Sequence, residues 1–146
     1  MRNDRLTVRP ARRADMKWIT PAAGRFGLDL DDTGRGRFYV AEVGGAAAGF
    51  ARMRRWDGFC DLGCVGVLEE FRGRSVAKAL VRRLVEICPA RMVWITTDIP
   101  SFFENLGFRE VAPGEAPREI AGQAGPARPS RARAKAAVMF IKKPAS

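Results

Sequence analysis

The spacing of hydrophobic positions changes several times along the chain, and these changes predict alternating strands and helices. Apolar residues that alternate with polar ones, or that run without a break, predict strands. Such runs cover residues 6–9, 37–43, 46–56, 60–68, 92–97, 108–112 and 138–143. Helices are predicted at about 15–25, 76–88 and 101–107, and the second of these repeats apolar residues every four positions. The first is expected to be short, because Pro21 and Gly24 interrupt it.

Glycine and proline mark the ends of several of these elements. Gly44-Gly45 lies between two strand-like runs and predicts a tight hairpin. Pro100 suits the first turn of the last helix, and Gly107 suits its C-terminal end. The chain therefore reads as a mixed α/β protein.

An arginine-rich turn joins the fourth strand to the most regular helix, in the stretch EFRGRSVAKALVRRL at residues 70–84. The start of a helix carries about half a positive charge and up to four free N–H groups, so this junction suits a phosphate. Ser75 stands where a phosphate-binding turn usually has a second glycine. We expect φ near −60° at Ser75, as in the first turn of a helix, and serine adopts that value without strain. The serine should therefore not spoil the turn.

Length and composition predict a single folded domain over residues 1–146. The chain is 47% hydrophobic and 29% charged, and a Pro/Gly/Ala/Arg-rich loop is expected at about 113–134, with a helical turn at 117–121. There is no apolar run of the roughly 20 residues that a membrane span needs, and no secretory signal is expected. Three cysteines without paired spacing indicate a reduced, cytoplasmic protein.

The net charge of +10 comes from the two ends of the chain. Residues 1–18 hold six Lys or Arg against two acids, residues 121–146 hold six against none, and residues 19–120 hold 14 of each sign. A basic end attracts nucleic acid through electrostatics that carry no sequence information. Because the excess positive charge lies only at the two ends and residues 19–120 are balanced, nucleic acid is not expected as the main partner.

The order of these elements and motifs resembles the GNAT superfamily of N-acetyltransferases, from Leu6 onward. The superfamily's pyrophosphate motif, Gln/Arg-x-x-Gly-x-Gly/Ala, is matched by Arg72 and Ala77, with Ser75 in place of its glycine. Its second signature, an aromatic pair, a glutamate and then Gly-Phe, is matched within FFENLGF at residues 102–108. The resemblance implies an α/β (α+β) acyl-CoA N-acyltransferase fold with a mixed, mostly antiparallel sheet flanked by helices. The branch that looks most similar holds N-acetylglutamate synthase-like and arsenic-resistance acetyltransferases.

The resemblance further implies acetyl-CoA as the acyl donor, with no metal. Its diphosphate would lie on the turn, and its pantetheine arm would pair with the backbone of Val65-Gly66-Val67. A glycine at 66 would let the arm come close, whereas Gly63 is more simply explained by a bulge. The residues expected to contact acetyl-CoA are Val65, Gly66, Val67, Arg72, Gly73, Arg74, Ser75, Val76, Ala77, Lys78 and Phe103.

Acetyl transfer to an amine needs a base, because alkyl amines are mostly protonated at neutral pH. The resemblance to the histone-acetylating branch implies Asp61, four residues before Val65, acting through a water. The alternative is that Asp61 is a solvent-facing residue at the start of a strand. Other branches place a glutamate where this chain has Thr96, which cannot serve as the base. Phe103 stands where the family often has a tyrosine that protonates the leaving thiolate.

Other catalytic schemes lack the necessary residues. The chain has no histidine, which excludes Ser/His and Cys/His nucleophiles. Cys60 and Cys64 have no obvious further ligands for zinc and are predicted to pack in the core.

The acceptor and two alternative functions stay open from the sequence. The similar branch implies a small amino-acid-like amine as the acceptor, whose carboxylate the basic 113–135 segment would bind. A short first helix would instead suit a larger acceptor such as a peptide terminus. One alternative is a CoA-binding regulatory protein without turnover, and another is a basic nucleic-acid-associated protein. We expect a cytoplasmic protein that binds acetyl-CoA and an amine, has no membrane partner, and could form a homodimer.

Overall fold

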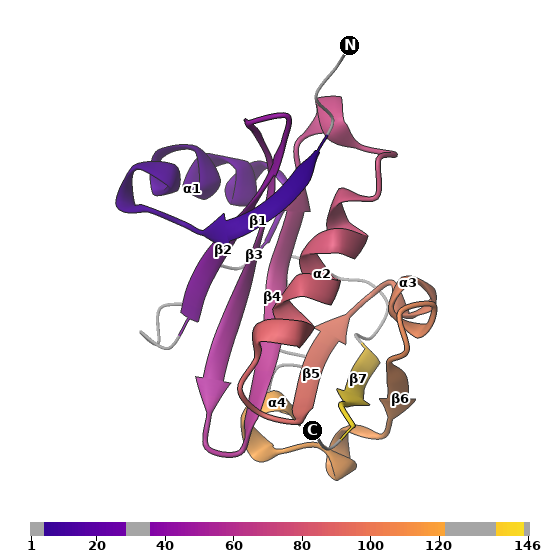
Figure 1. Cartoon of the computed structure of the whole chain (residues 1–146). Helices are drawn as coiled ribbons and strands as arrows, with labels where there is room; N and C mark the ends of the chain where they lie inside the picture. The colour runs from indigo at the N-terminus through magenta and orange to yellow at the C-terminus, as the bar shows by residue number, and fades with distance from the viewer. Residues whose placement is uncertain (1–4, 29–35, 122–136, 145–146) are drawn as a thin grey trace. The chain divides into compact units, whose positions relative to one another are not determined.

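The computed structural model describes residues 5–28, 36–121 and 137–144, which form two compact units (Figure 1). The first unit comprises residues up to Arg55 together with Leu62–Ile87. The second comprises Trp56–Asp61 and the chain from Cys88 onward.

The sheet of the first unit is antiparallel where the register is given, and its strands lie in the order of the chain. These strands are β1 (Leu6–Pro10), β2 (Gly36–Val43), β3 (Ala46–Trp56) and β4 (Phe59–Val67), of which Trp56 and the first three residues of β4 belong to the second unit. Leu6 of β1 lies opposite Val43 of β2, and Gly36 of β2 lies opposite Arg54 of β3. The predicted hairpin is confirmed, because Gly44 and Gly45 have φ values of 58° and 86°, which a type I′ turn requires.

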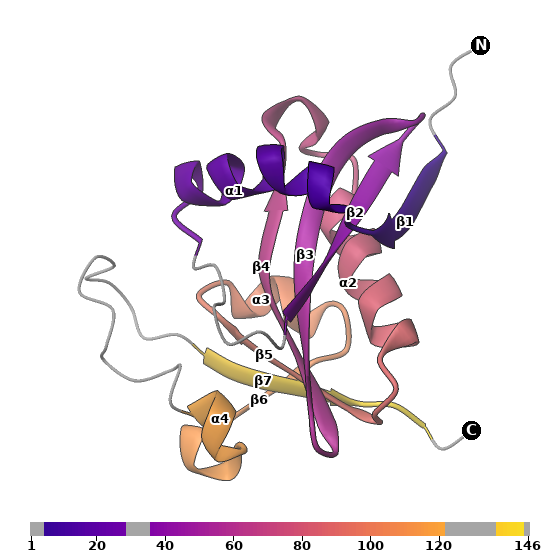
Figure 2. The same ribbon diagram turned by 90° about the vertical axis from the view of Figure 1, so that its left-hand side faces the viewer.

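Two helices, α1 (Met16–Arg25) and α2 (Val76–Ile87), cover opposite faces of this sheet (Figure 2). The α1 helix packs against Phe50 of β3, one of the largest fully buried side chains of the described chain. The predicted interruption of α1 is wrong, since Pro21 lies inside the helix without ending it. Packing explains this outcome: Ile19, Ala22 and Ala23 are fully buried, and this burial holds the helix despite the missing N–H.

The start of α1 is fixed to the sheet by the buried carboxylate of Asp15. Arg9 Nη1 and Nη2 lie 2.8 and 3.1 Å from its two oxygens, and Arg9 Nε also donates to Glu42 at 2.9 Å. The backbone N–H of Arg12 and the indole N–H of Trp18 donate to the same carboxylate at 2.7 and 3.1 Å. The hydrogen bonds from Arg9 hold the pKa of Asp15 well below its usual range, against the opposing effect of burial. This network joins β1, β2 and α1.

In the second unit, three strands pair in an antiparallel way in the order β5-β7-β6. Its strands are β5 (Met92–Thr97), β7 (Ala137–Lys142) and β6 (Arg109–Val111), and its helices are α3 (Pro100–Glu104) and α4 (Arg118–Ala121). Trp94, Ile120 and Val138 form its buried cluster. The predicted helical turn at 117–121 is confirmed by α4, and residues 122–134 of the expected loop lie outside the described residues.

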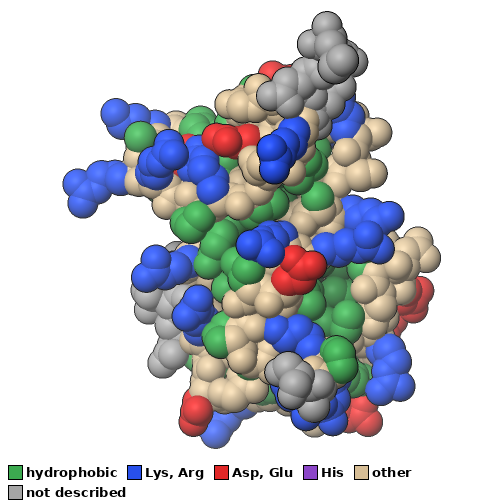
Figure 3. All heavy atoms as spheres, in the orientation of Figure 1, with side chains coloured by type: hydrophobic (Ala, Val, Ile, Leu, Met, Phe, Trp, Pro, Cys, Tyr) green, Lys and Arg blue, Asp and Glu red, His purple; other side chains and the backbone are tan. Residues whose placement is uncertain are grey.

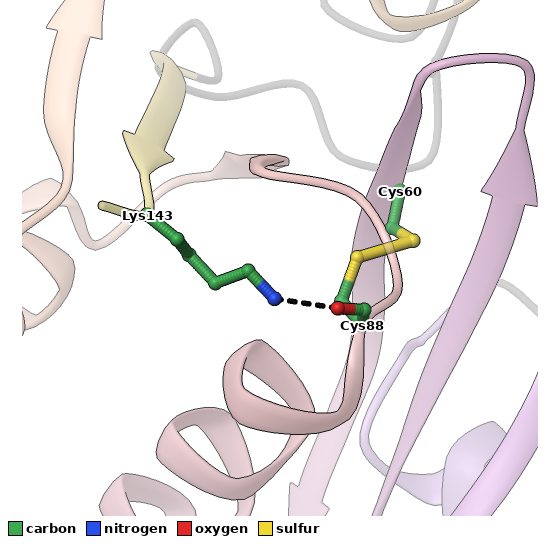
Figure 4. The surroundings of a disulfide bond; sticks show 3 residues. All are labelled: Cys60, Cys88 and Lys143. Atoms are coloured by element: carbon green, nitrogen blue, oxygen red, sulfur yellow. Dashed lines mark hydrogen bonds between the residues drawn. A yellow bond between two sulfur atoms is a disulfide. The ribbon is translucent and has the colours of Figure 1, made fainter. Parts of the chain in front are cut away.

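A disulfide joins Cys60 of β4 to Cys88, the residue that follows α2 (Figure 4). Both cysteines are almost fully buried, and Lys143 Nζ donates a hydrogen bond to the carbonyl oxygen of Cys88. The prediction that the cysteines are all reduced is therefore wrong. The spacing of cysteines in the sequence does not reveal this pair, because the two residues are 28 positions apart and are brought together only by the fold of β4, the following turn and α2. The cysteine-based argument for a cytoplasmic location no longer holds.

The seven predicted strands are all present in the described part of the chain, with ends that differ by at most one residue. In those same ranges, no helix has the length and apolarity needed to cross a membrane. On the face drawn in Figure 3, basic side chains are spread out among acidic and apolar ones and do not form one patch.

Candidate functional site

The turn before α2 has a backbone conformation that the sequence analysis did not anticipate. Gly73 has φ of +81° and Ser75 has φ of +61°, so both are left-handed. The expected φ near −60° at Ser75 is therefore wrong. The physical reason is position: Ser75 precedes the helix instead of belonging to its first turn, and its carbonyl oxygen accepts the N–H of Ala79 at 3.1 Å.

Left-handed residues before a helix favour an anion-binding turn. In such turns successive backbone N–H groups point toward one concave spot, to which the helix N-terminus adds its own free N–H groups. A left-handed serine costs roughly 1–2 kcal/mol relative to glycine, and strain of this kind gathers at functional sites. The conformation of Ser75 thus supports the prediction of an anion site by a route different from the one expected.

The two arginines of the turn rest on aromatic rings. The guanidinium carbon of Arg72 lies 5.1 Å from the ring centre of Phe26, and that of Arg74 lies 5.6 Å from Phe71. Arg72 Nε also donates to the carbonyl oxygen of Val67 at 3.1 Å, which ties the turn to the end of β4. Both arginines are exposed, so their positive charge is presented at the turn.

The first residues of α2 differ in what they can offer to a ligand. Val76 is buried, Ala77 is half-buried and Lys78 is exposed. Val76 can therefore contribute only its backbone to a bound anion, whereas Lys78 can contribute charge.

The end of β4 is shaped by glycine and by an irregular backbone. Cys64 has φ of +51°, a left-handed conformation that inside a strand is typical of a bulge. A Cβ on Gly66 would lie 2.5 Å from Phe50 and 3.0 Å from Phe26. The missing side chain of Gly66 therefore accommodates two rings of the protein itself. Gly63 has a similar explanation, since a Cβ there would collide with the guanidinium of buried Arg52.

Sequence reasoning missed Gly49 of β3, which lies beside this strand end. A Cβ on Gly49 would lie 2.8 Å from the carbonyl oxygen of Gly66, 3.1 Å from Val76 and 3.4 Å from Leu80. The available signal was a glycine in the interior of a predicted strand, which often marks a close backbone approach.

The predicted base, Asp61, is the third residue of β4 and is only 2% exposed. The alternative of a solvent-facing residue is therefore wrong. Asp61 also interacts with another group in the structure. Its predicted catalytic role stays a prediction.

The second signature forms a packed aromatic group in the second unit. Phe103 is 3% exposed, and its ring packs edge-on against Phe102 at 4.9 Å and Phe108 at 5.6 Å between ring centres. Gly107 ends this turn with φ of +100°. A contact between Phe103 and a cofactor stays a prediction.

Taken together, the first unit presents a basic turn with left-handed residues, a helix start and an adjoining strand end. This arrangement can hold a diphosphate through backbone N–H groups and an extended chain along β4. Among the described residues, no three His, Cys, Asp or Glu side chains gather as a metal site would require.

A family model for an acetyltransferase (GNAT) domain matches residues 34–110, which is just over half of the chain. A search of curated proteins by sequence returned no match.

Solved structures with similar folds are numerous, and three illustrate them. N-acetylglutamate synthase from Neisseria gonorrhoeae, complexed with coenzyme A and N-acetyl-glutamate, has a TM-score of 0.75 at 14% identity, over 94% of this chain and 35% of that one. A Mycobacterium tuberculosis protein in complex with CoA has a TM-score of 0.73 at 18% identity, over 93% of this chain and 98% of that one. The ribosomal-protein-S18-alanine N-acetyltransferase of Escherichia coli has a TM-score of 0.72 at 14% identity, over 97% of each chain. The chain thus spans about a third of the synthase, and at these identities the likeness shows the α/β fold.

Proposed function

The chain belongs to the GNAT acetyltransferase family, and we propose that it transfers the acetyl group of acetyl-CoA to a primary amine. The observation that carries this proposal is the turn before α2, where Gly73 and Ser75 are left-handed immediately before the helix start. A match over residues 34–110 includes this turn.

The diphosphate of acetyl-CoA would lie on the backbone N–H groups of residues 73–77. The exposed Arg74 and Lys78 would add positive potential, while Arg72 would hold the turn against β4 through Val67. The pantetheine arm would run along Val65-Gly66-Val67, with its amides paired to the strand backbone as an added strand would be.

The reaction is an attack by the neutral amine on the thioester carbonyl. A tetrahedral oxyanion forms, a backbone N–H near Val67 stabilises it, and the thiolate of CoA leaves. Asp61 would take the amine proton through a water, which suits a carboxylate that is buried and shorter than glutamate. Holding the two reactants together supplies much of the remaining rate.

A small amino-acid-like amine is the acceptor that we propose. Its support is the N-acetylglutamate synthase among the structural neighbours, which was crystallised with N-acetyl-glutamate. The basic 113–135 segment, which is predicted to bind the carboxylate of the acceptor, lies mostly outside the described residues.

The test is release of the CoA thiol from acetyl-CoA in the presence of a panel of amines. Asp61→Asn should lower the rate by roughly 10²–10⁴ while acetyl-CoA affinity changes little. Asp57→Asn, an exposed aspartate in the β3–β4 turn, is the matched control and should keep the wild-type rate. A wild-type rate in Asp61→Asn, at a pH where the amine is mostly protonated, would exclude Asp61 as the base.

One observation favours a second function, a CoA-binding protein without turnover. Phe103 lies in an aromatic core where the family often has a tyrosine acid. Tight binding of acetyl-CoA without thiol release for any amine of the panel would support this alternative.

A further inference from the structure

Gly49 is a buried glycine of β3 whose missing side chain leaves room for two other elements. From its position, an added Cβ would meet the Gly66 carbonyl oxygen on β4 at 2.8 Å and Val76 Cγ1 at the start of α2 at 3.1 Å. Its neighbour Phe50 points to the opposite face, toward α1. Gly49 therefore sits where a strand and a helix both come close to β3.

The two atoms beside Gly49 belong to residues that the proposed function places against acetyl-CoA. Gly66 lies in the strand end that would pair with the pantetheine arm, and Val76 lies at the helix start that would hold the diphosphate. All four residues, Gly49, Gly66, Val76 and the neighbouring Leu80, belong to the first unit.

We propose that Gly49 is a positioning residue of the acetyl-CoA site, which sets how closely the β4 strand end and the α2 helix start pack on β3. The inference rests on the proposed function, because it assigns these two elements to one cofactor. No residue other than glycine can fill this role without moving backbone, since real Cβ atoms do not lie 2.8 Å from a carbonyl oxygen.

A methyl group at position 49 would displace the strand end more than the helix. The contact with Gly66 is the closer one and involves a backbone oxygen, which cannot rotate away. Leu80 Cδ1, at 3.4 Å, is already at an ordinary contact distance and needs no shift. Shifts of this kind at a binding site are costly, because about 1 Å of misplacement can cost roughly a hundredfold in rate.

Gly49→Ala is the test variant, and Gly24→Ala is its matched control. Gly24 lies in α1 with nothing within 4 Å of an added Cβ, so alanine there should stabilise the helix and leave binding unchanged. Ile19→Val, a buried change on α1, serves as a control for mild loss of stability.

Two probes separate a local effect from a general one: acetyl-CoA, and adenosine 3′-phosphate 5′-diphosphate, the nucleotide half of CoA without its arm. By titration calorimetry well below the melting temperature, Gly49→Ala should bind acetyl-CoA more than about tenfold more weakly than wild type. The nucleotide half should lose no more than about threefold, because the helix start moves less. Equal losses for both probes would overturn the proposal in favour of a general structural role.

Wild-type affinity for acetyl-CoA in folded Gly49→Ala would also overturn the positioning role while leaving the proposed function intact. Absence of acetyl-CoA binding by the wild-type protein would instead overturn the proposed function and this inference with it. If Gly49→Ala does not fold, Gly24→Ala/Gly49→Ala is compared with Gly24→Ala, because alanine at position 24 should stabilise α1 and leave binding unchanged. Tenfold weaker binding by the double variant supports the proposal, and equal binding overturns it.

Discussion

The left-handed conformation of Ser75 leads to a prediction about stability. Ser75→Gly should make the protein more stable, because glycine adopts φ of +61° without the clash that a Cβ makes with the neighbouring carbonyl oxygen. The gain from released strain is about 1–2 kcal/mol. Glycine's greater freedom in the unfolded chain offsets about 0.5–1 kcal/mol of this gain.

The net effect can be converted to a melting temperature. Unfolding entropy of about 2.1 cal/mol/K per residue gives roughly 0.3 kcal/mol/K for a chain of 146 residues. A net gain near 0.5–1 kcal/mol then raises the melting temperature by about 2–3 °C. Differential scanning calorimetry or thermal circular dichroism resolves a change of this size.

Two control variants separate backbone conformation from the hydroxyl group. Ser75→Ala removes the hydroxyl but keeps a Cβ at a left-handed residue, so it should gain nothing. Gly73→Ala adds a Cβ at φ of +81° in open space, so it should lose about 1–2 kcal/mol from conformation alone. Equal stability of Ser75→Gly and Ser75→Ala would show that Ser75 is not left-handed in solution.

The same variant also tests the ligand turn. Ser75→Gly preserves every backbone N–H, so acetyl-CoA affinity should change by less than about tenfold, or roughly 1.4 kcal/mol. Loss of binding beyond that limit would mean that the serine hydroxyl itself contacts the ligand.

Two further predictions concern stabilising features away from the turn. Unfolding in denaturant without reductant should expose one titratable thiol, and reduction of the Cys60–Cys88 disulfide should expose three. Reduction should also lower the free energy of unfolding by about 3.5 kcal/mol by the loop-entropy relation. Three titratable thiols without reductant would contradict the pairing. Asp15→Asn should destabilise the protein by about 2–3 kcal/mol at pH 7, because it removes the carboxylate that pairs with both Nη atoms of Arg9 and leaves Glu42 as its remaining partner in this network. The depressed pKa of Asp15 means that its contribution to stability is fully present above the ordinary carboxyl pKa near 3.9 and is lost progressively as pH falls toward the folded-state pKa. The difference in stability between wild type and Asp15→Asn should therefore begin to narrow below about pH 4.

The sequence predicted the elements well because hydrophobic periodicity depends on local spacing. β5 at Met92–Thr97 and β3 at Ala46–Trp56 agree residue for residue with their predicted runs. Pro21 was misjudged because tertiary packing of α1 outweighed the local cost of proline. The disulfide was missed because it depends on contacts that no local pattern encodes.

The candidate site was predicted in outline, and its backbone detail was not. The motif of Arg72 and Ala77 located the turn, but the sign of φ at Ser75 depends on where the helix begins, to within one residue. Gly49 carries no motif, because its importance arises from two elements that approach it from later in the chain. A glycine inside a strand is thus a sequence signal for a close backbone approach.

The disulfide has a topological consequence for the proposed cofactor segment. Cys60 and Cys88 close a covalent ring that contains the end of β4, the turn at 72–75 and all of α2. The turn is exposed and carries two arginines, so trypsin should cut it more readily than the buried strands. A chain nicked there would remain a single covalent molecule, and its two fragments would separate on a denaturing gel only after reduction.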